Sequence, residues 1–403
     1  MTKRRVREAF HAGSVYTVLT TFALLMTFPF LVMLFTSFKT TADSFRFPPR
    51  LLPRDNVRVE LPQADEPAPL YQIQLDGEEA ELALVERSIR VGNFVDVASE
   101  QTFQLPLDEA IELTADGEQQ TTTYDGEIVP LYRITVDGAQ RDVALVGRTG
   151  LGRFVDPQNP ERTALANVRQ STPVERILFT GRSYREVVEL HGMDRSLTNT
   201  ALVTILVVLG QLTTSVFGGY AFARLRFPGR DKLFVAYLGT IMIPFAVLIT
   251  PLYQLMVALG WVDHLAALII PWIFTAYGTF LMRQFFLSIP REIEEATIID
   301  GASRLQILRH VFLPASTPAL ASLATFTFLY AWNSFFWPLV VINSGNADNR
   351  VLTLALTVLG GRAADSPNLV LAGATIAVLP PMIIYIFGQR FFVENQAQSG
   401  LKG

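Results

Sequence analysis

The residues best placed to do chemistry lie in one polar stretch, residues 290–314, between two apolar segments. Pro290 suits the first position of a helix, and three glutamates follow closely, where the positive end of the helix dipole favours them. Gly301 suits the residue that ends this helix in a left-handed conformation. Ser303 and Gln306 have the spacing of a capping box, which begins another helix. The pattern therefore predicts a helix, a tight turn and a second helix that ends at Pro314.

The second of these helices is expected to be amphipathic. Leu305, Leu308 and Phe312 recur at three- and four-residue intervals, which predicts that they share one face. A rigid unit with a polar and an apolar side suits docking into a cleft of a soluble partner. It equally suits an amphipathic loop on the membrane surface, and the residue pattern alone leaves both alternatives open.

Sequence patterns of enzyme active sites are missing from the chain. Cys is absent, which excludes disulfides, thiolate metal sites and cysteine nucleophiles. No Gly-x-x-x-x-Gly-Lys-Ser/Thr loop, which would hold a nucleotide, occurs, and neither do His-Glu-x-x-His and Gly-x-Ser-x-Gly. The histidines are scattered and indicate surface or interface positions: His11, His191, His264 and His310. We therefore expect no enzyme, no catalytic residue, no metal site and no cofactor on this chain, and the net charge of −4 suggests no nucleic-acid partner.

The composition is typical of a membrane protein. Half of the 403 residues are hydrophobic and 17% are charged, against about a quarter charged in soluble domains. Apolar segments of about 20 residues predict spanning helices: Val15–Phe38, Leu197–Phe217, Leu233–Val257, Ala266–Phe286, Ala319–Ile342 and Leu369–Phe391. We therefore expect an all-α membrane protein with six transmembrane helices, in which Gly218, Gly219 and Ser215 allow close helix contact. Ionisable residues are scarce in these segments, so a proton relay made of carboxylates is not expected.

Basic residues in the short loops predict the orientation of the spans. Lys and Arg gather in the N-terminal segment, after the second span and in residues 290–314, which places all three on the cytoplasmic side. The first apolar run is too long for a signal peptide, so we expect it to remain as an uncleaved span. The predicted location is the bacterial inner membrane, with multiple passes and both termini in the cytoplasm.

An acidic insert separates the first two spans on the predicted outer side. Residues 59–156 hold roughly 20 acidic residues, about 6 basic ones and no Lys. Pro69–Gly77 returns 61 positions later as Pro130–Gly138, and after a one-residue slip the match closes at Gly92–Asp96 and Gly152–Asp156. Each copy places Asp-Gly between apolar runs, which predicts a β-hairpin. The expected domains are residues 1–53, a β-rich extracytoplasmic insert at 54–180, a transmembrane core at 181–393 and a cytoplasmic tail at 394–403.

The polar stretch resembles the "EAA" coupling motif of ABC importer permeases. That motif reads Glu-Ala-Ala, three residues, Gly, nine residues and Ile-x-Leu-Pro. Here Glu295-Ala296-Thr297 is followed at the same spacing by Gly301 and by Val311-x-Leu313-Pro314, so the chain departs from the motif at Thr297 and Val311. Residues 36–40, 278–286 and 332–339 resemble the carbohydrate-uptake branch, and residues 389–403 resemble the second permease of maltose-type systems. The resemblance covers about residues 15–53 and 181–403 and leaves out the acidic insert.

The resemblance implies a fold, a mechanism and partners. The fold would be that of type I ABC importer permeases, with coupling residues Glu295, Ala296, Thr297, Asp300, Gly301 and Ala302. The partners would be a second homologous permease, two ATP-binding subunits that hold ATP and Mg, and an extracytoplasmic sugar-binding protein, with membrane lipid around the spans. Closure of the ATPase dimer would drive alternating access for a maltose- or oligosaccharide-type sugar, and Glu295 would pair with a basic group of the ATPase. The tail would either reach the ATPase interface or form a disordered terminus.

The path of the sugar is a separate hypothesis. Tyr330, Trp332, Asn333 and Trp337 combine aromatic faces with an amide, as sugar stacking requires, but helix packing or an interfacial belt is favoured for them. The main alternative function is an importer of another solute, such as a polyol or an oligopeptide. A membrane sensor with the insert as receptor is less expected, because the short cytoplasmic segments offer no output domain. The insert suits docking to the binding protein or partner permease and a tolerated insertion equally well.

Overall fold

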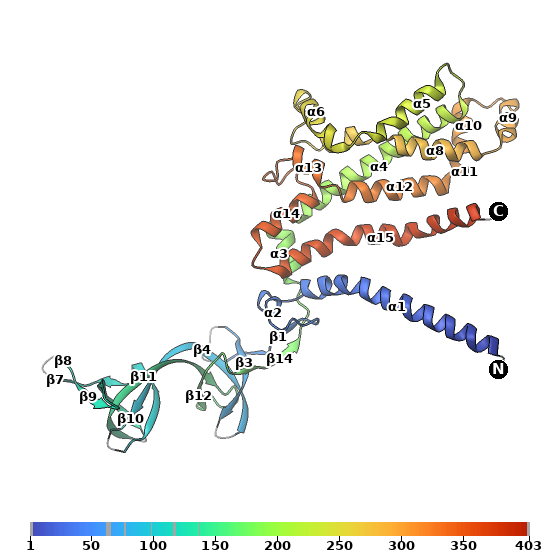
Figure 1. Ribbon diagram of the computed structural model, residues 1–403. Helices are drawn as coiled ribbons and strands as arrows, with labels where there is room; N and C mark the ends of the chain where they lie inside the picture. The colour runs from blue at the N-terminus through green and yellow to red at the C-terminus, as the bar shows by residue number, and fades with distance from the viewer. Residues whose placement is uncertain are drawn as a thin grey trace. The chain divides into compact units, whose positions relative to one another are not determined.

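The computed structural model describes residues 3–400 except 62–65, 76–77, 98, 116–117 and 137, and its described side chains also leave out 3–10, 75, 190–191, 362 and 390–400. The chain forms two compact units, Met1–Pro53 with Phe179–Gly403, and Arg54–Leu178. The first unit is helical and the second is made of β-strands (Figure 1). The tail beyond Gly400 lies outside the described residues, and helix α15 continues to Gly400.

The helical unit is built around α4, which lies against α8 and α12, while α15 lies against α12 and α1 (Figure 1). Its elements are α1(Lys3–Ser37), α2(Thr41–Ser44), α3(Arg182–His191), α4(Met193–Arg224), α5(Arg230–Gly239), α6(Phe245–Ala258), α7(Ala266–Ile269), α8(Ala276–Ser288), α9(Arg291–Ile299), α10(Arg304–Ile307), α11(Leu313–Ala315), α12(Thr317–Trp332), α13(Phe336–Val341), α14(Leu352–Arg362) and α15(Pro367–Gly400). Short 3₁₀ turns at Thr240–Met242 and Ile270–Trp272 and a π-helical segment at Leu308–Phe312 complete it.

Four helical stretches of the described residues are long and apolar enough to cross a membrane. They are His11–Ser37, Met193–Arg224, Ala266–Ser288 and Pro367–Gln389. Two further stretches are bent pairs, Arg230–Met242 with Phe245–Ala258 at 99°, and Arg304–Ala315 with Thr317–Trp332 at 78°. Up to six spans follow if each bent pair is one span, so the count of six stays a prediction.

The helices of the predicted third and fifth spans are interrupted near prolines. The third breaks at Ile243, which is extended (φ −77°, ψ 115°), because a proline at the next position disfavours helical geometry in the residue before it. In the predicted fifth span, helix α12 ends at Trp332, and α13 follows after a short break. Pro338 has no N–H to bond the carbonyl of Ser334, and that carbonyl accepts a bond from the Thr353 hydroxyl instead (2.7 Å).

The contact between α4 and α8 confirms the close packing predicted at small residues. A Cβ on Gly219 would lie 2.7 Å from the Met282 Cβ and 3.0 Å from the backbone nitrogen of Arg283. A Cβ on Gly278, in turn, would lie 2.3 Å from the Ser215 Oγ. The two helices therefore touch at backbone distance, which side chains larger than Gly or Ser would prevent.

The β unit contains two antiparallel hairpins, as the repeat predicts, joined through their second strands. The strands are β1(Arg54–Asn56), β2(Arg58–Val59), β3(Ala68–Leu75), β4(Glu78–Val95), β5(Thr102–Pro106), β6(Ile111–Glu112), β7(Thr114–Ala115), β8(Glu118–Gln119), β9(Thr121–Tyr124), β10(Glu127–Val136), β11(Ala139–Val155), β12(Thr163–Ala166), β13(Thr172–Pro173) and β14(Glu175–Ile177). Hairpins β3–β4 and β10–β11 are both antiparallel, and β4 pairs with β11. The predicted turn at Asp76-Gly77 lies outside the described residues, as does Asp137, whereas Gly138 has the positive φ of +77° that such a turn uses.

The two copies of the repeat exchange parts of their cores. One core holds Tyr71, Ile73, Leu82 and Leu84 of the first copy with a phenylalanine of the second, Phe154. The other holds the equivalent residues Tyr132, Ile134, Val143 and Leu145 with a phenylalanine of the first copy, Phe94. Each hairpin therefore completes its core with a phenylalanine of the other copy.

Candidate functional site

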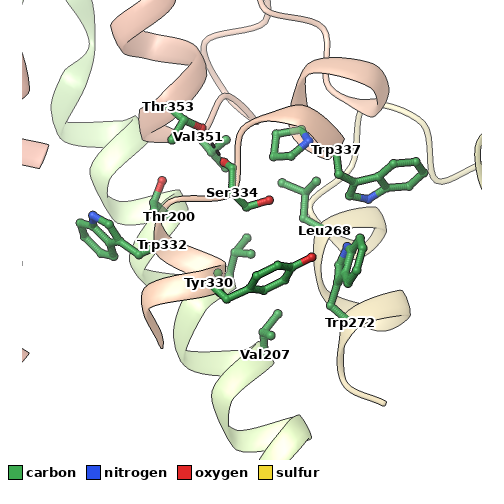
Figure 2. A pocket seen from close by; sticks show the side chains of 13 residues that line it. Thr200, Val207, Leu268, Trp272, Tyr330, Trp332, Ser334, Trp337, Val351 and Thr353 are labelled. Atoms are coloured by element: carbon green, nitrogen blue, oxygen red, sulfur yellow. Dashed lines mark hydrogen bonds between the residues drawn. The ribbon is translucent and has the colours of Figure 1, made fainter. Parts of the chain in front are cut away.

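A small apolar pocket lies where the fifth predicted span meets α4 and the segment α7–Trp272 (Figure 2). Trp337 is 2% exposed and its indole N–H donates to the Ala267 carbonyl (2.9 Å). Trp332 is 5% exposed and donates to the Ala377 carbonyl (3.0 Å). Both predicted path residues are therefore packed into the helix bundle with their polar atoms satisfied.

The other two predicted path residues are more accessible. Tyr330 is 54% exposed, and its ring lies 5.8 Å from that of Trp272 (Figure 2). Asn333 is exposed, and its amide donates back to the Leu329 carbonyl of its own helix (2.8 Å). The pocket has a cavity volume of about 20 Å³, which holds roughly one water molecule. In this conformation it offers no room for a sugar.

The predicted helix-turn-helix is present in residues 290–315, and its turn has a Schellman geometry. Gly301 has φ +83°, its N–H bonds the Ile298 carbonyl (3.0 Å), and the next N–H, of Ala302, bonds the Thr297 carbonyl (3.2 Å). The Ser303 side chain caps α10, and the Gln306 side chain returns the bond, so the capping box is confirmed. Local sequence signals thus fix the shape of this unit.

The second helix differs from the prediction in which of its side chains face the bundle. After α10 the chain forms the π-helical segment Leu308–Phe312 and does not stop at Pro314. A π turn holds more residues than an α turn, so it rotates Phe312 toward the side of Ile307. Ile307, Leu308 and Phe312 are at most 3% exposed, whereas Leu305 is 63% exposed. The apolar face was therefore predicted correctly for Leu308 and Phe312 and wrongly for Leu305.

The inner face of the unit packs onto the ends of α4, α8 and α12. Phe312 meets Tyr220 at 5.2 Å and Phe286 at 5.3 Å between ring centroids, both edge to face. The same cluster includes Met282, Leu323 and half-buried Ala302. Fully burying such side chains is worth about 1.5–3 kcal/mol each, so the helix-turn-helix forms one packed body with three membrane helices.

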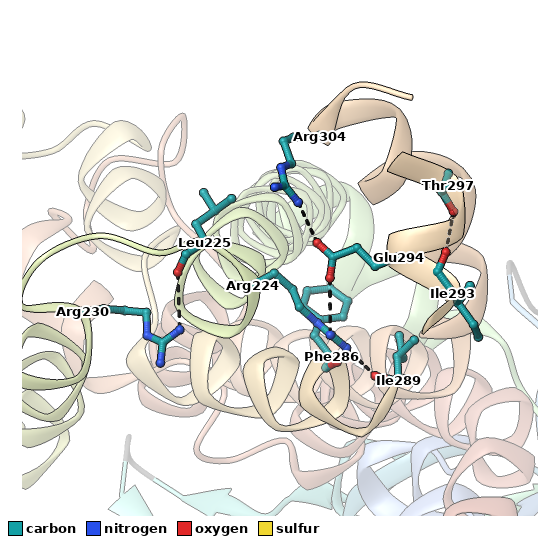
Figure 3. A network of polar contacts seen from close by, with 9 residues as sticks. All are labelled: Arg224, Leu225, Arg230, Phe286, Ile289, Ile293, Glu294, Thr297 and Arg304. Atoms are coloured by element: carbon teal, nitrogen blue, oxygen red, sulfur yellow. Dashed lines mark hydrogen bonds and ion pairs between the residues drawn. The ribbon is translucent and has the colours of Figure 1, made fainter. Parts of the chain in front are cut away.

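A buried ion pair adds a polar link beneath α9 (Figure 3). Arg224, in the last turn of α4, lies 3.4 Å from Glu294 and has only 4% of its side chain exposed. It donates to the Phe286 and Ile289 carbonyls at the end of α8, and its guanidinium lies 5.0 Å from the Phe312 ring centroid. Glu294 also accepts a 2.8 Å bond from Arg304. One arginine therefore ties α4, α8 and α9 together.

Sequence reasoning missed this pair. Glu294 was treated only as one of three glutamates at a helix start, and Arg224 only as a cation of a cytoplasmic loop. The available signal was that Glu294 and Glu295 are adjacent, so only one of them can face the core of a helix while the other faces out.

The outer face of the unit is exposed and partly apolar. Among the predicted coupling residues, Glu295, Ala296, Asp300 and Gly301 are exposed, while Thr297 and Ala302 are half-buried. The exposed apolar side chains beside them are Ile298 at 43%, Ile299 at 86% and Leu305 at 63%. A Cβ on Gly301 would have no atom within 4 Å. Exposed apolar residues gathered beside acidic ones are typical of a protein-docking surface.

Within the described part of the chain, no group of three or more His, Asp or Glu residues is arranged to hold a metal ion. His264 and His310 each contact a nearby backbone carbonyl through Nδ1.

Known proteins resemble the helical part of this chain. The family described as "Binding-protein-dependent transport system inner membrane component" matches residues 200–396. The sn-glycerol-3-phosphate transport system permease protein UgpE of Pectobacterium atrosepticum is 33% identical over 217 residues, which are 52% of this chain and 77% of the relative. The arabinooligosaccharides transport system permease protein AraQ of Halalkalibacterium halodurans is 36% identical over 205 residues, which are 51% of this chain and 73% of the relative.

A crystal structure of a bacterial ABC transporter that imports the acidic polysaccharide alginate is also similar, with 26% identity and a TM-score of 0.47 over 54% of this chain and 82% of that one. The assignment rests on the sequence relatives, which are permeases and not enzymes. Together with the apolar helices they identify a multi-pass protein of the inner membrane. The chain belongs to the family of binding-protein-dependent transport system inner membrane components, as a permease of the ABC importers for carbohydrates.

Proposed function

We propose that this chain is the permease subunit that receives ATP-driven motion at residues 290–315 and converts it into alternating access for a sugar or polyol derivative. Two ATP-binding subunits, a second related permease and an external binding protein complete the importer. ATP and Mg are held by the ATP-binding subunits, in keeping with a chain whose sequence has no nucleotide loop.

One observation carries this proposal: the helix-turn-helix is fixed on its inner face and free on its outer face. The inner face is tied to α4, α8 and α12 by the aromatic cluster and by Arg224. The outer face offers Glu295, Ile298 and Ile299 to a partner. A push on such a body moves three membrane helices together, because packed elements shift as units and do not deform smoothly.

Gly301 provides the sharpest test of this role. Gly301→Asp places a charged side chain in open space on the docking face, and the matched control Gly301→Asn places a neutral one of equal size there. Asn and Asp both tolerate the left-handed conformation, whose cost for other side chains is about 1–2 kcal/mol, so both variants keep the turn. The Asp charge also meets the negative end of the α9 dipole, at a cost of about 0.3–1 kcal/mol, so the folded yields of the two variants are compared first and the remaining difference reports on the partner surface.

The assay is the complete importer, reconstituted with its ATP-binding subunits, second permease and binding protein. We expect Gly301→Asp to abolish sugar-stimulated ATP hydrolysis and uptake while the chain still inserts, and Gly301→Asn to retain most of both. Glu295→Ala should uncouple transport as well, since Glu295 is proposed to pair with a basic group of the ATPase. Normal coupling in Gly301→Asp would rule out the docking role.

The solute is proposed to be a carbohydrate or a polyol derivative, since the named relatives serve sn-glycerol 3-phosphate and arabinooligosaccharides. Maltose remains one candidate among these. Of the four proposed path residues, Tyr330 has the accessible ring, and Asn333→Ala tests the amide. A binding-protein-stimulated uptake assay across labelled maltose, glycerol 3-phosphate and an arabinooligosaccharide decides the solute. Purification as a lone oligomer, without an ATPase, would favour the alternative of a membrane sensor.

A further inference from the structure

The two copies of the repeat in the β unit differ by one inserted residue, and the structure locates it. The copies are 61 positions apart at Val85 and Val146 but 60 apart at Gly92 and Gly152. In the pairing of β4 with β11, Ile89 pairs with Leu151, and the next pair is Glu86 with Arg153. Between these two pairs β4 advances by three residues and β11 by only two. The extra residue forms a β-bulge that holds Arg87 and Ser88. Bulges re-aim side chains and recur beside functional sites.

A short loop after β12 faces this bulge and is held in place by packing and hydrogen bonds. Val168 packs over Gly152, where a Cβ would lie 2.4 Å from the valine Cγ2. The side chain of Asn167 accepts a bond from the backbone N–H of Arg169 (3.0 Å), and its carbonyl accepts one from the N–H of Ser171 (3.0 Å). The backbone of the loop is therefore held in place at Arg169.

The bulge and the loop border an open polar pocket of about 620 Å³. That volume lies within the range of about 300–1,000 Å³ found for small-molecule sites. Arg87, Ser88, Asn167 and Arg169 line it together with Tyr71. The lining thus offers two guanidinium groups, a hydroxyl and an amide, and guanidinium groups bind carboxylates and phosphates in a bidentate manner.

The lining of this pocket is cationic, whereas the unit that contains it is acidic overall. Acidic residues clearly outnumber basic ones in residues 54–178, and several of its arginines pair with them: Arg133 with Asp142, Arg141 with Asp96, and Arg153 with Glu86. Within the described residues, neither Arg87 nor Arg169 pairs with a carboxylate. Two arginines that line one pocket without a carboxylate partner among the described residues leave their charge and donors available to an anion.

The second copy of the repeat supplies an internal comparison. Its counterpart of Arg87 is Arg148, and the first-copy position equivalent to Arg169 is Asp108. Leu107 packs on one core as Val168 packs on the other, and Thr102 pairs with Val95 as Thr163 pairs with Val155, so the two loops correspond in structure. In the second location the charges of Arg148 and Asp108 cancel. In the pocket, by contrast, Arg87 and Arg169 both contribute positive charge.

We propose that the pocket at Arg87 and Arg169 binds a small organic anion, a carboxylate or a phosphate ester. The anion occupies the space between the two guanidinium groups and accepts further bonds from Ser88 and Asn167. The site belongs to the β unit, and its ligand binding does not depend on the coupling role of residues 290–315.

The test is calorimetric titration of the full-length chain in detergent with D-glucuronate, with glucose 6-phosphate and with neutral D-glucose. We expect at least one anion to bind and glucose not to bind. Arg87→Gln and Arg169→Gln should each weaken binding about tenfold or more, the loss of one charge-assisted contact. Arg148→Gln, the matched control in the second copy, should change it less than about twofold.

Both arginines are exposed, so these substitutions should leave the β unit folded, and far-UV circular dichroism checks that. Binding of glucuronate alone identifies a carboxylate ligand, and binding of glucose 6-phosphate alone identifies a phosphate ester. Absence of binding by either anion, equal binding of glucose, or unchanged affinity in the double variant Arg87→Gln/Arg169→Gln would overturn the proposal. An equal loss in Arg148→Gln would overturn it too, because it would place recognition outside this pocket.

Discussion

Exchange of Glu294 for Gln is the most informative single change in the helix-turn-helix. The substitution keeps the size of the side chain and its bond to Arg304 but removes the negative charge beside Arg224. Arg224 would then be a cation with only 4% of its side chain exposed and no carboxylate partner at this position. A buried charge that loses its partner is strongly destabilising.

The expected cost follows from the burial of the two partners. Breaking a buried ion pair by removing one member costs about 3–5 kcal/mol. Arg224 keeps its bonds to the Phe286 and Ile289 carbonyls and its contact with the Phe312 ring, so we take the lower end, about 3 kcal/mol. That free energy corresponds to a factor of about 150 in the equilibrium between the attached and detached states of α9.

The matched control is Arg304→Gln, which removes the other cation next to Glu294. The side chain of Arg304 is 58% exposed, and ion pairs exposed to solvent contribute about 0–1 kcal/mol. The control should therefore shift the same equilibrium by less than about fivefold.

Hydrogen exchange of the full-length chain in nanodiscs measures this equilibrium. Protection of the amides in α9 should fall roughly 100-fold in Glu294→Gln and only slightly in Arg304→Gln. In the reconstituted importer, Glu294→Gln should also weaken the coupling of ATP hydrolysis to uptake. Unchanged protection of α9 in Glu294→Gln, or an equal loss in Arg304→Gln, would refute the reasoning that the buried Arg224 pair attaches the unit.

Three further predictions concern packing and charge. Gly219→Ala should separate α4 from α8 and lower thermal stability by about 1–3 kcal/mol, measured by unfolding of the chain in detergent. Gly92→Ala should destabilise the β unit by a similar amount, because the new Cβ would lie 2.5 Å from the Phe94 ring. In the β10–β11 hairpin, the hydrogen bond from Arg133 holds the pKa of Asp142 below its usual range. An NMR titration should show the pKa of Asp142 rising toward that range in Arg133→Gln. In the unchanged chain, the contribution of the pair to the free energy of unfolding should be lost as the pH falls through the lowered pKa.

Two glycines with free space serve as controls for the packing predictions. Gly360→Ala lies in α14 with no atom within 4 Å of the new Cβ, so it should leave stability unchanged or raise it. In Gly147→Ala the new Cβ would lie 3.4 Å from the Asn93 side chain, so this change should lower the stability of the β unit less than Gly92→Ala does. Equal losses at crowded and uncrowded glycines would contradict the close-contact argument.

The parts of the structure that sequence predicted correctly depend on neighbouring residues. The turn at Gly301 and the capping box at Ser303 are set by hydrogen bonds that span three to five residues. A short stretch of sequence is therefore enough to predict them. The hairpins of the repeat follow from alternating apolar residues with turn residues between them. Small residues likewise indicated the contact of α4 with α8.

The parts that sequence missed depend on residues far apart in the chain. Arg224 and Glu294 are 70 positions apart and meet only because α4 and α8 pack at backbone distance. The phase of the second helix, which buries Ile307 and exposes Leu305, depends on a π turn stabilised by its contacts with the bundle.

By itself, then, the sequence determined the membrane class, the duplicated β-hairpins and the helix-turn-helix of residues 290–314, because periodicity and capping act locally. Only the tertiary structure decided which glutamate faces inward, which arginine meets it, and that Arg87 and Arg169 share one pocket. Those outcomes arise from packing between distant segments, which brings charges together that no sequence window contains.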